Sequence, residues 1–394
     1  MTTTLTEKTF AQLLTAAGGA NGTRVNAQGR IEAAVTPAFD YDSITLAARG
    51  LRFRGPARTN LLTNSQLSAL GIAEGTTPPT VGVATIDGEA CSAVTFTSAM
   101  AAGYTGSRWR SNGSAAPIAP STTYSTSSYV KFSRPLVGSE SINVYYTGMS
   151  GMGSTNITAA TSAPYAERFT RVSVGNATPN VTGTVYPVVH IASALASNLT
   201  VWICKGQVEV GVSASSYIPT GVGAVARTID AVTIPNVHQA PWFNMAEGTF
   251  LVDFDVSLMP TASTNFGIFC ISNAANTSYL IASIGSNGSV AIQASTPISL
   301  ASAAGLVPAG MTRRLSISYK TGTKILLSVE GAAAIQSGPA FGGFAGGAHD
   351  LRLGNFATNP GPLDGHIQNF VYWPKAANAT EIVSLTPETA TIIG

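Results

Sequence analysis

The feature that most constrains the fold is a long series of short segments in which apolar and polar residues alternate. A period of two is the pattern of half-buried β-strands, and the Gly, Pro, Asn and Ser residues between the segments predict turns. No helical pattern separates one segment from the next. The sequence therefore predicts antiparallel β-sandwiches. The clearest segments are 122–133, 141–149, 167–175, 184–192, 199–211, 248–259, 279–294, 313–331 and 365–374.

The two ends of the chain show helical rather than strand patterns. Residues 6–17 place apolar side chains on one helical face before Gly18 and Gly19, so we expect a helix there, and residues 378–385 predict a last helical turn or two. The expected fold class is all-β: two antiparallel β-sandwich (jelly-roll) domains after a short N-terminal module with a helix and strands. The expected boundaries are 1–60 for an N-terminal attachment module, 61–222 for the first sandwich and 223–394 for the second.

Charge is scarce, and its scarcity bears on partners. Charged residues make up 10% of the 394, against roughly 25% in ordinary soluble domains. A surface so poor in charge is commonly shared with neighbouring chains, so we expect a homo-oligomer or a larger assembly. The net charge is only +2, and a cluster of Arg49, Arg52, Arg54 and Arg58 is the one basic concentration. We therefore expect no nucleic-acid partner, and Asp40 and Asp42 are candidate partners of the cluster.

The sequence shows no clear pattern for disulfides, a zinc site, a membrane span or a signal peptide. Cys91, Cys204 and Cys270 are odd in number and widely spaced, which favours three buried thiols over disulfides or a zinc site. No apolar run approaches the roughly 18 residues of a membrane span, so we expect no membrane insertion. The first residues lack the pattern of a signal peptide, and we expect synthesis in a cytoplasm.

No catalytic motif is recognisable. The four histidines are dispersed, and no nucleophile elbow, phosphate-binding loop or metalloprotease motif occurs. Asp253 and Asp255 share one face of a predicted strand and invite comparison with the paired acids of glycosidases. They alternate with a Phe/Val face that belongs to a core, so solvated strand acids are the favoured interpretation. We expect a protein that is not an enzyme.

Two loop regions are candidate binding sites. The segment 103–114 is rich in Gly and Ser, and an exposed Trp flanked by Arg would form a stacking platform for a sugar; the alternative is that Trp109 begins a strand and is buried. The candidate glycan-binding residues are Tyr104, Arg108, Trp109, Arg110 and Asn112. The oxygen-bearing side chains of Asp350, Asn355 and Asp364 are weak candidates for holding Ca²⁺, and no other cofactor is suggested.

Two motifs resemble those of known proteins. "GLRFRGPARTNLLTNS" (50–65) and "GQVEVGVSASSYIPTGVGAVARTIDAVTI" (206–234) resemble signatures that open and close the middle domain of many tailed-bacteriophage virion proteins. That middle domain looks like a carbohydrate-binding-module jelly roll. The segments that follow, ending in "LDGHIQNFVYWPKAANATEIVSL", are similar to the concanavalin A/laminin-G-like lectin domain. Arg54 and Ala226 depart from the family pattern, which calls for an acidic residue and a Thr.

The resemblance implies a structural protein of the virion, of the tail- or head-fibre type, with host-surface glycans as ligands. Its partners would be other virion proteins and copies of itself, as a trimer if it is a fibre. The alternatives are a decoration or fibre protein that binds nothing and a polysaccharide depolymerase. The run 206–234 is then a joint between domains, with Arg227 and Asp230 as expected partners of each other.

Overall fold

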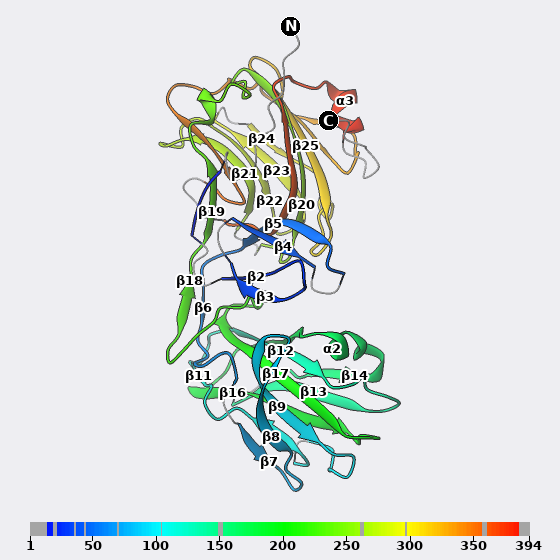
Figure 1. The fold of residues 1–394 in the computed structure, drawn as a ribbon. Helices are drawn as coiled ribbons and strands as arrows, with labels where there is room; N and C mark the ends of the chain where they lie inside the picture. The colour runs from blue at the N-terminus through cyan, green and yellow to red at the C-terminus, as the bar shows by residue number, and fades with distance from the viewer. Residues whose placement is uncertain are drawn as a thin grey trace.

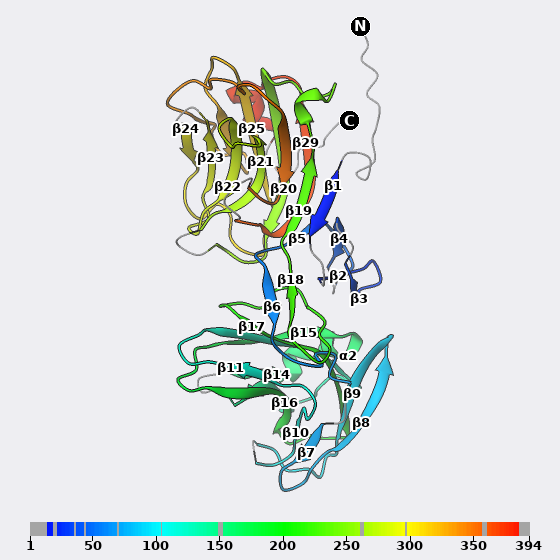
Figure 2. The same ribbon diagram turned by 90° about the vertical axis from the view of Figure 1, so that its left-hand side faces the viewer.

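The chain folds into two β-sandwiches stacked end to end. The computed structural model describes residues 14–18, 22–34, 37–42, 45–68, 71–103, 105–148, 153–260, 264–295, 298–356 and 361–385. One lobe holds the middle of the chain and the other holds its C-terminal part, with N-terminal strands between and against them (Figures 1 and 2). Named strands pair only in antiparallel fashion within the described residues, which confirms the predicted all-β, antiparallel class.

The middle sandwich packs two sheets face to face. The β13 sheet has the order β14-β13-β16-β10-β7, and β11 also pairs with β16; the β12 sheet has the order β15-β12-β17-β9-β8. The strands of the β13 sheet are β7 (Ile72–Glu74), β10 (Arg108–Arg110), β11 (Ala116–Ile118), β13 (Ser141–Thr147), β14 (Thr155–Thr158) and β16 (Gly183–Ser193). Those of the β12 sheet are β8 (Thr80–Ile86), β9 (Glu89–Phe96), β12 (Tyr124–Phe132), β15 (Thr170–Ala177) and β17 (Leu199–Val210).

The C-terminal sandwich also has two sheets. The β21 sheet has the order β1-β19-β28-β21-β22-β23-β24, and the β20 sheet has the order β27-β26-β25-β20-β29-β5-β4. The strands of the β21 sheet are β1 (Thr15–Gly18), β19 (Asp230–Ile234), β21 (Phe266–Asn273), β22 (Tyr279–Ile284), β23 (Val290–Ala294), β24 (Ile298–Ala301) and β28 (His349–Leu353). Those of the β20 sheet are β4 (Ala38–Tyr41), β5 (Ala48–Arg54), β20 (Glu247–Val256), β25 (Arg313–Lys320), β26 (Leu326–Val329), β27 (Ile335–Gln336) and β29 (Asp364–Trp373).

The N-terminal residues belong to the C-terminal sandwich, which differs from the separate module expected over 1–60. β5 pairs with β29, and β1 pairs with β19. Leu51 and Phe53 of β5 are each 1% exposed and lie in the same core as β20. The helix expected over 6–17 is wrong at its C-terminal end, where Thr15–Gly18 is a strand because β19 offers it an edge; residues 6–13 lie outside the described residues.

Two short strand pairs occupy the space between the lobes. β2 (Thr23–Val25) and β3 (Ile31–Ala33) form a hairpin, and β6 (Arg58–Asn60) pairs with β18 (Val225–Arg227) where the chain passes from one lobe to the other and back (Figures 1 and 2). Within the residues that the structure describes, the helical elements are the 3₁₀ turns Ala159–Thr161 and Val237–Gln239 and the helices α2 (Ala163–Glu167) and α3 (Ala379–Ser384). The Asn378 side chain caps α3, which lies within the helical turns predicted over 378–385.

A buried ion pair lies within the C-terminal sandwich, where β5 ends and β19 begins. The Arg54 guanidinium donates to both carboxylate oxygens of Asp230, and both residues are at most 2% exposed. Arg227 does not form the expected pair with Asp230: its Nη2 instead donates to the backbone carbonyls of Arg54 and Pro56. Burial lowers the pKa of Arg227 to about 10, and the charge of Asp230 opposes that effect. Arg54, and not Arg227 as the sequence predicts, is therefore the ion-pair partner of Asp230.

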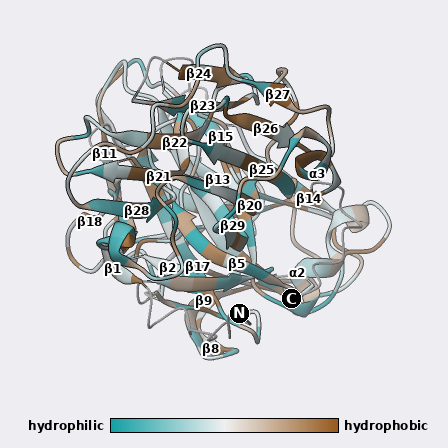
Figure 3. Cartoon of the chain, turned by 90° about the horizontal axis from the view of Figure 1, so that it is seen from above, coloured by the Kyte–Doolittle hydropathy of each residue, from teal (hydrophilic) through white to brown (hydrophobic). Residues whose placement is uncertain are grey.

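Each sandwich has its own apolar core. Brown and teal segments alternate along strands such as β29 (Figure 3), because neighbouring side chains of a strand point to opposite faces. The three cysteines are buried and free, as predicted. Among the described residues, no helix has both the length and the apolar composition of a membrane span.

Candidate functional site

Strand β10 turns two arginines outward and one tryptophan inward. Trp109 is 0% exposed and lies in the core of the middle sandwich, so the alternative of a buried Trp is the one the structure shows. Because side chains alternate along a strand, Arg108 and Arg110 lie together on the opposite face of the β13 sheet. Both guanidiniums contact Glu74 of β7, with Nε–Oε distances of 2.7 Å for Arg108 and 3.0 Å for Arg110.

The strand register extends this polar surface across the sheet. Arg108 is opposite Glu74 on one side and His190 on the other, and His190 is opposite Asn143 of β13. The Asn143 amide nitrogen lies 3.2 Å from His190 Nε2. Burial and the nearby charge of Arg108 lower the pKa of His190, so its imidazole is neutral at pH 7. One row of side chains thus offers a carboxylate, a guanidinium, an imidazole and an amide in sequence.

Two tyrosines lie beside this row. The guanidinium carbon of Arg110 lies 4.9 Å from the centre of the Tyr186 ring, and the Tyr145 ring contacts the His190 ring edge to face at 5.3 Å between centres. A depression of about 330 Å³ lies over them. We call this surface the sheet face. It comprises Glu74, Arg108, Arg110, Asn143, Tyr145, Tyr186 and His190.

The candidate glycan-binding residues of 103–114 lie at different places in the structure. Arg108 and Arg110 are on the sheet face, Trp109 is in the core, and Asn112 is exposed in the turn after β10. Tyr104 lies outside the described residues. The stacking platform expected of Trp109 is wrong, because that side chain fills the interior while its neighbours face out. Sequence reasoning missed Tyr145, Tyr186 and His190, although the polar residues at alternate positions of β13 and β16 are a detectable signal.

The calcium candidates do not gather at one place. Asp350 pairs with Arg352 at 2.9 Å on the β21 sheet, and Asp364 pairs with Arg52 at 2.9 Å on the β20 sheet. The Asn355 side chain accepts from the backbone of Phe356. Within the described ranges, no group of three or more His, Cys, Asp or Glu residues is placed to hold a metal ion.

The paired strand acids are buried, which corrects the expectation that they are solvated. Asp253 is 5% exposed and forms two hydrogen bonds with Arg314, at 2.6 and 2.8 Å. Asp255 is 1% exposed and contacts Arg49 at 3.1 Å. The two acids are covered by side chains from other strands of the same sheet, Arg314 of β25 over Asp253 and Arg49 of β5 over Asp255. The alternating pattern of β20 alone does not reveal this cover.

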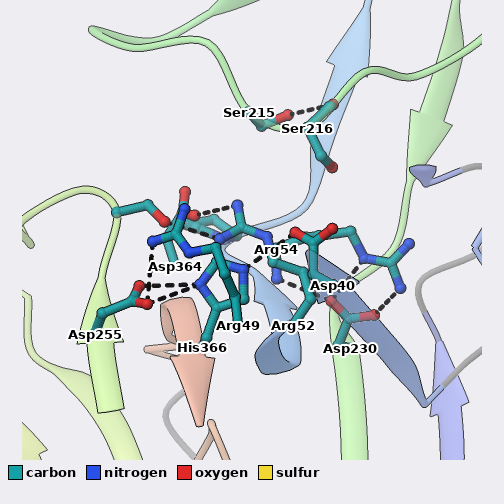
Figure 4. Close-up of polar contacts among 12 residues, drawn as sticks. Asp40, Arg49, Arg52, Arg54, Ser215, Ser216, Asp230, Asp255, Asp364 and His366 are labelled. Atoms are coloured by element: carbon teal, nitrogen blue, oxygen red, sulfur yellow. Dashed lines mark hydrogen bonds and ion pairs between the residues drawn. The ribbon is translucent and has the colours of Figure 1, made fainter. Parts of the chain in front are cut away.

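Asp255 belongs to a chain of charges around His366 (Figure 4). His366 Nδ1 lies 3.0 Å from Asp255 and Nε2 lies 3.1 Å from Asp40. Burial alone would raise the pKa of both carboxyls, but the hydrogen bond and charge of His366, with Arg52 near Asp40 and Arg49 near Asp255, lower them overall. Each ring nitrogen of His366 thus faces a carboxylate oxygen, Nδ1 that of Asp255 and Nε2 that of Asp40. Asp40 therefore pairs with His366 rather than with an ion-pair partner in the arginine cluster.

Comparisons with known proteins find likeness in solved structures only. No protein-family model and no curated protein matches the chain. The carbohydrate-binding module CBM40 of the Ruminococcus gnavus IT-sialidase, solved with α2,3-sialyllactose, aligns with 36% of this chain and 84% of its own at 14% identity and a TM-score of 0.32. Domains LG4-5 of the mouse laminin α1 chain align with 70% of this chain and 92% of their own at 11% identity and a TM-score of 0.27.

A third similar structure is the CBM22-1–CBM22-2 tandem of Paenibacillus barcinonensis Xyn10C. It aligns with 80% of this chain and 100% of its own at 9% identity and a TM-score of 0.22. These structural neighbours are carbohydrate-binding modules and laminin G-like domains.

Proposed function

We propose that the sheet face of the middle sandwich binds a carbohydrate without cleaving it, and that the chain does so as a fibre- or spike-type structural protein of a tailed bacteriophage. The observation that carries the binding proposal is the juxtaposition on one sheet of two tyrosines with the polar row of Glu74, Arg108, His190 and Asn143. No single loop motif produces it.

The sheet face has the two kinds of group that sugar recognition needs. Aromatic rings pack against the apolar C–H faces of a sugar, and Tyr145 and Tyr186 are half-buried and so held in place. Arginine and asparagine donate hydrogen bonds to hydroxyl oxygens, and Glu74 accepts them from hydroxyl groups. Because Arg108 and Arg110 share one carboxylate, the face carries a surplus positive charge that favours a sugar with an acidic substituent.

The virion part of the proposal is supported by sequence. The motifs at 50–65 and 206–234 resemble those of phage virion proteins, and both fall in the structure at the joint between the lobes. The low charge content suits a chain that buries surface against neighbours. The proposed partners are other virion proteins and copies of this chain in a closed symmetric assembly, and the proposed location is the virion.

The burial and ion pairs of Asp253 and Asp255, the candidate catalytic acids of a polysaccharide depolymerase, argue against that activity. Asp253 and Asp255 are held by Arg314 and by Arg49 with His366, respectively, and both are buried. A general acid or nucleophile must reach the glycosidic bond, and these carboxylates have no open path to one. A product-release assay on host polysaccharide is therefore expected to be negative.

The test is a glycan array probed with the full-length chain, in calcium and in chelator. We expect binding to a restricted set of glycans, those with acidic sugars among them, and no dependence on calcium because the candidate calcium ligands are dispersed. An array without hits in either buffer would contradict glycan binding. It would favour the alternative of a decoration or fibre protein that binds nothing. Hits that vanish in chelator would contradict the metal-free site.

A further inference from the structure

A second cavity, of about 290 Å³, lies between the lobes. One wall comes from β2, β4, β5 and β29, and the other comes from β12, β15 and the turn 213–217. Figure 4 shows the turn with Ser215 and Ser216 opposite the charged cluster around Asp40 and Arg52. We call this cavity the interlobe cleft. It is distant in the fold from the sheet face, since its middle-sandwich wall is the β12 sheet.

Most charges in the interlobe cleft are neutralised within the chain. Arg24 pairs with Glu32, as the 2.6 Å contact shows. The remaining pairs already described are those of Arg49 with Asp255, Arg52 with Asp364, and His366 with Asp40 and Asp255. These residues shape the wall next to the C-terminal sandwich and leave it little net charge.

Arg171 on the opposite wall is different. Its Nε and Nη2 donate to the Ser127 hydroxyl at 3.1 and 2.7 Å, and its guanidinium lies over the Tyr129 ring at 5.7 Å. No carboxylate of the described residues forms an ion pair with it. The neutral partners fix the guanidinium without cancelling its charge, so Nη1 is left as a positively charged donor at the cleft.

Two further donors without acceptors line the same cleft. The Tyr129 hydroxyl makes no hydrogen bond within the described part of the chain, and burial raises its pKa, so it keeps its proton at pH 7. The Ser216 Oγ is buried and has no hydrogen-bond partner. Figure 4 shows the Ser216 side chain pointing from its turn toward the charged cluster. A buried hydroxyl left without a partner is unfavourable, and an acceptor in the cleft would satisfy it.

We propose that the interlobe cleft binds a small oxyanion, a carboxylate or a phosphate, whose oxygens accept from Arg171, Tyr129 and Ser216. All three groups donate hydrogen bonds, and one carries an unneutralised charge, which is the combination that recognises oxyanions. The cleft is large enough for the anion to carry a hydroxylated body, whose hydroxyls would meet Asp40 and Ser257 on the facing wall. The bound anion would then contact both lobes.

The test is calorimetric titration of the full-length chain at low salt with D-glucuronate and with inorganic phosphate. D-glucose is the neutral match for glucuronate. Variants Arg171→Gln, Tyr129→Phe and Ser216→Ala remove the three donors one at a time. Arg30→Gln is the matched control, because Arg30 is an exposed residue of the β2–β3 turn outside the interlobe cleft and its loss changes the net charge equally.

We expect at least one of the two anions to bind while glucose does not, and the identity of that anion distinguishes a carboxylate from a phosphate site. Arg171→Gln should weaken binding about tenfold or more, and the other two variants about two- to fivefold, with Arg30→Gln unchanged. If Arg171→Gln fails to fold, the Tyr129 and Ser216 variants decide. Absence of binding by both anions, equal binding of glucose, or donor variants that bind like wild type would overturn the proposal.

Substitutions on the sheet face are expected to leave anion binding unchanged. Loss of glycan binding in such variants with retained anion binding would separate the two sites. Failure of one proposal therefore does not decide the other.

Discussion

A single carboxylate, Glu140, links two loops of the middle sandwich. Arg134 binds both of its oxygens, at 2.7 and 2.8 Å, and the same oxygens accept from the backbone of Val137 and Ala196. The hydrogen bond from Arg134 is the main cause that lowers the pKa of Glu140 to about 2, against the smaller opposing effect of burial. The side chain is only 2% exposed.

The lowered pKa predicts a specific acid sensitivity. A carboxyl whose pKa is lower in the folded state contributes stability that is present above about pH 4.5 and is lost as the pH falls toward 2. Glu140→Gln should lower the free energy of unfolding at pH 7 by roughly 2–3 kcal/mol and flatten its dependence on pH between 4.5 and 2. Urea unfolding at a series of pH values measures both effects.

The matched control for that experiment is Glu167→Gln. Glu167 is 65% exposed, and its one ion pair among the described residues is with Arg168, at 3.4 Å, so its loss should change stability by less than about 0.5 kcal/mol. If wild type and Glu140→Gln lose stability in parallel between pH 4.5 and 2, Glu140 is not the group responsible.

At the sheet face, the sequence predicts part of the site and misplaces one residue. Arg108 and Arg110 could be selected because charged residues beside a Trp suggest a binding surface, and they do lie on one face. Trp109 could not be placed, since in a three-residue strand only the neighbouring strands decide which face is buried. Glu74, Tyr145 and Tyr186 come from three other strands. The sequence of one strand does not determine its register against another, so these residues could not be placed beside Arg108 and Arg110.

The strands themselves were largely predictable, and their partners were not. The alternation in 199–211 and 248–259 corresponds to β17 (Leu199–Val210) and β20 (Glu247–Val256). The pairing of β5 with β29, by contrast, joins residues more than 300 positions apart, and Arg52 forms a hydrogen bond with Asp364 across it. Local periodicity reports which face of a strand is apolar and carries no information on so distant a partner.

This long-range pairing predicts which fragments of the chain fold on their own. The fragment 223–394 lacks β1, β4 and β5, so it loses Leu51 and Phe53 from its core and leaves the edge of β29 unpaired. It should show no cooperative thermal unfolding by circular dichroism and should aggregate on gel filtration. The fragment 61–222 retains every strand of both middle sheets and serves as the comparison, with cooperative unfolding expected. Cooperative unfolding of 223–394 near the melting temperature of the full chain would show that β5 is dispensable.

On the scale of the whole molecule, two stacked sandwiches present distinct surfaces on either side of one joint (Figure 2). The joint pairs β6 with β18, so two hydrogen-bonded strands link the lobes (Figure 2). Next to the joint, the buried ion pair of Arg54 with Asp230 connects β5 to β19 within the C-terminal sandwich. In an oligomer, several sheet faces would be presented together, and weak binding by each would sum to strong attachment.

The central proposal, glycan binding at the sheet face, is tested most directly by comparing one dissociation constant across three proteins. The ligand is the sugar that binds best on the array, titrated into wild type, Tyr186→Ala and Tyr279→Ala. Tyr279 is a half-buried tyrosine on β22 of the other sandwich and controls for the loss of an aromatic side chain. We predict that Tyr186→Ala weakens binding about tenfold or more while its thermal stability stays close to that of wild type, and that Tyr279→Ala binds like wild type. Equal affinity of wild type and Tyr186→Ala would contradict a binding site at the sheet face.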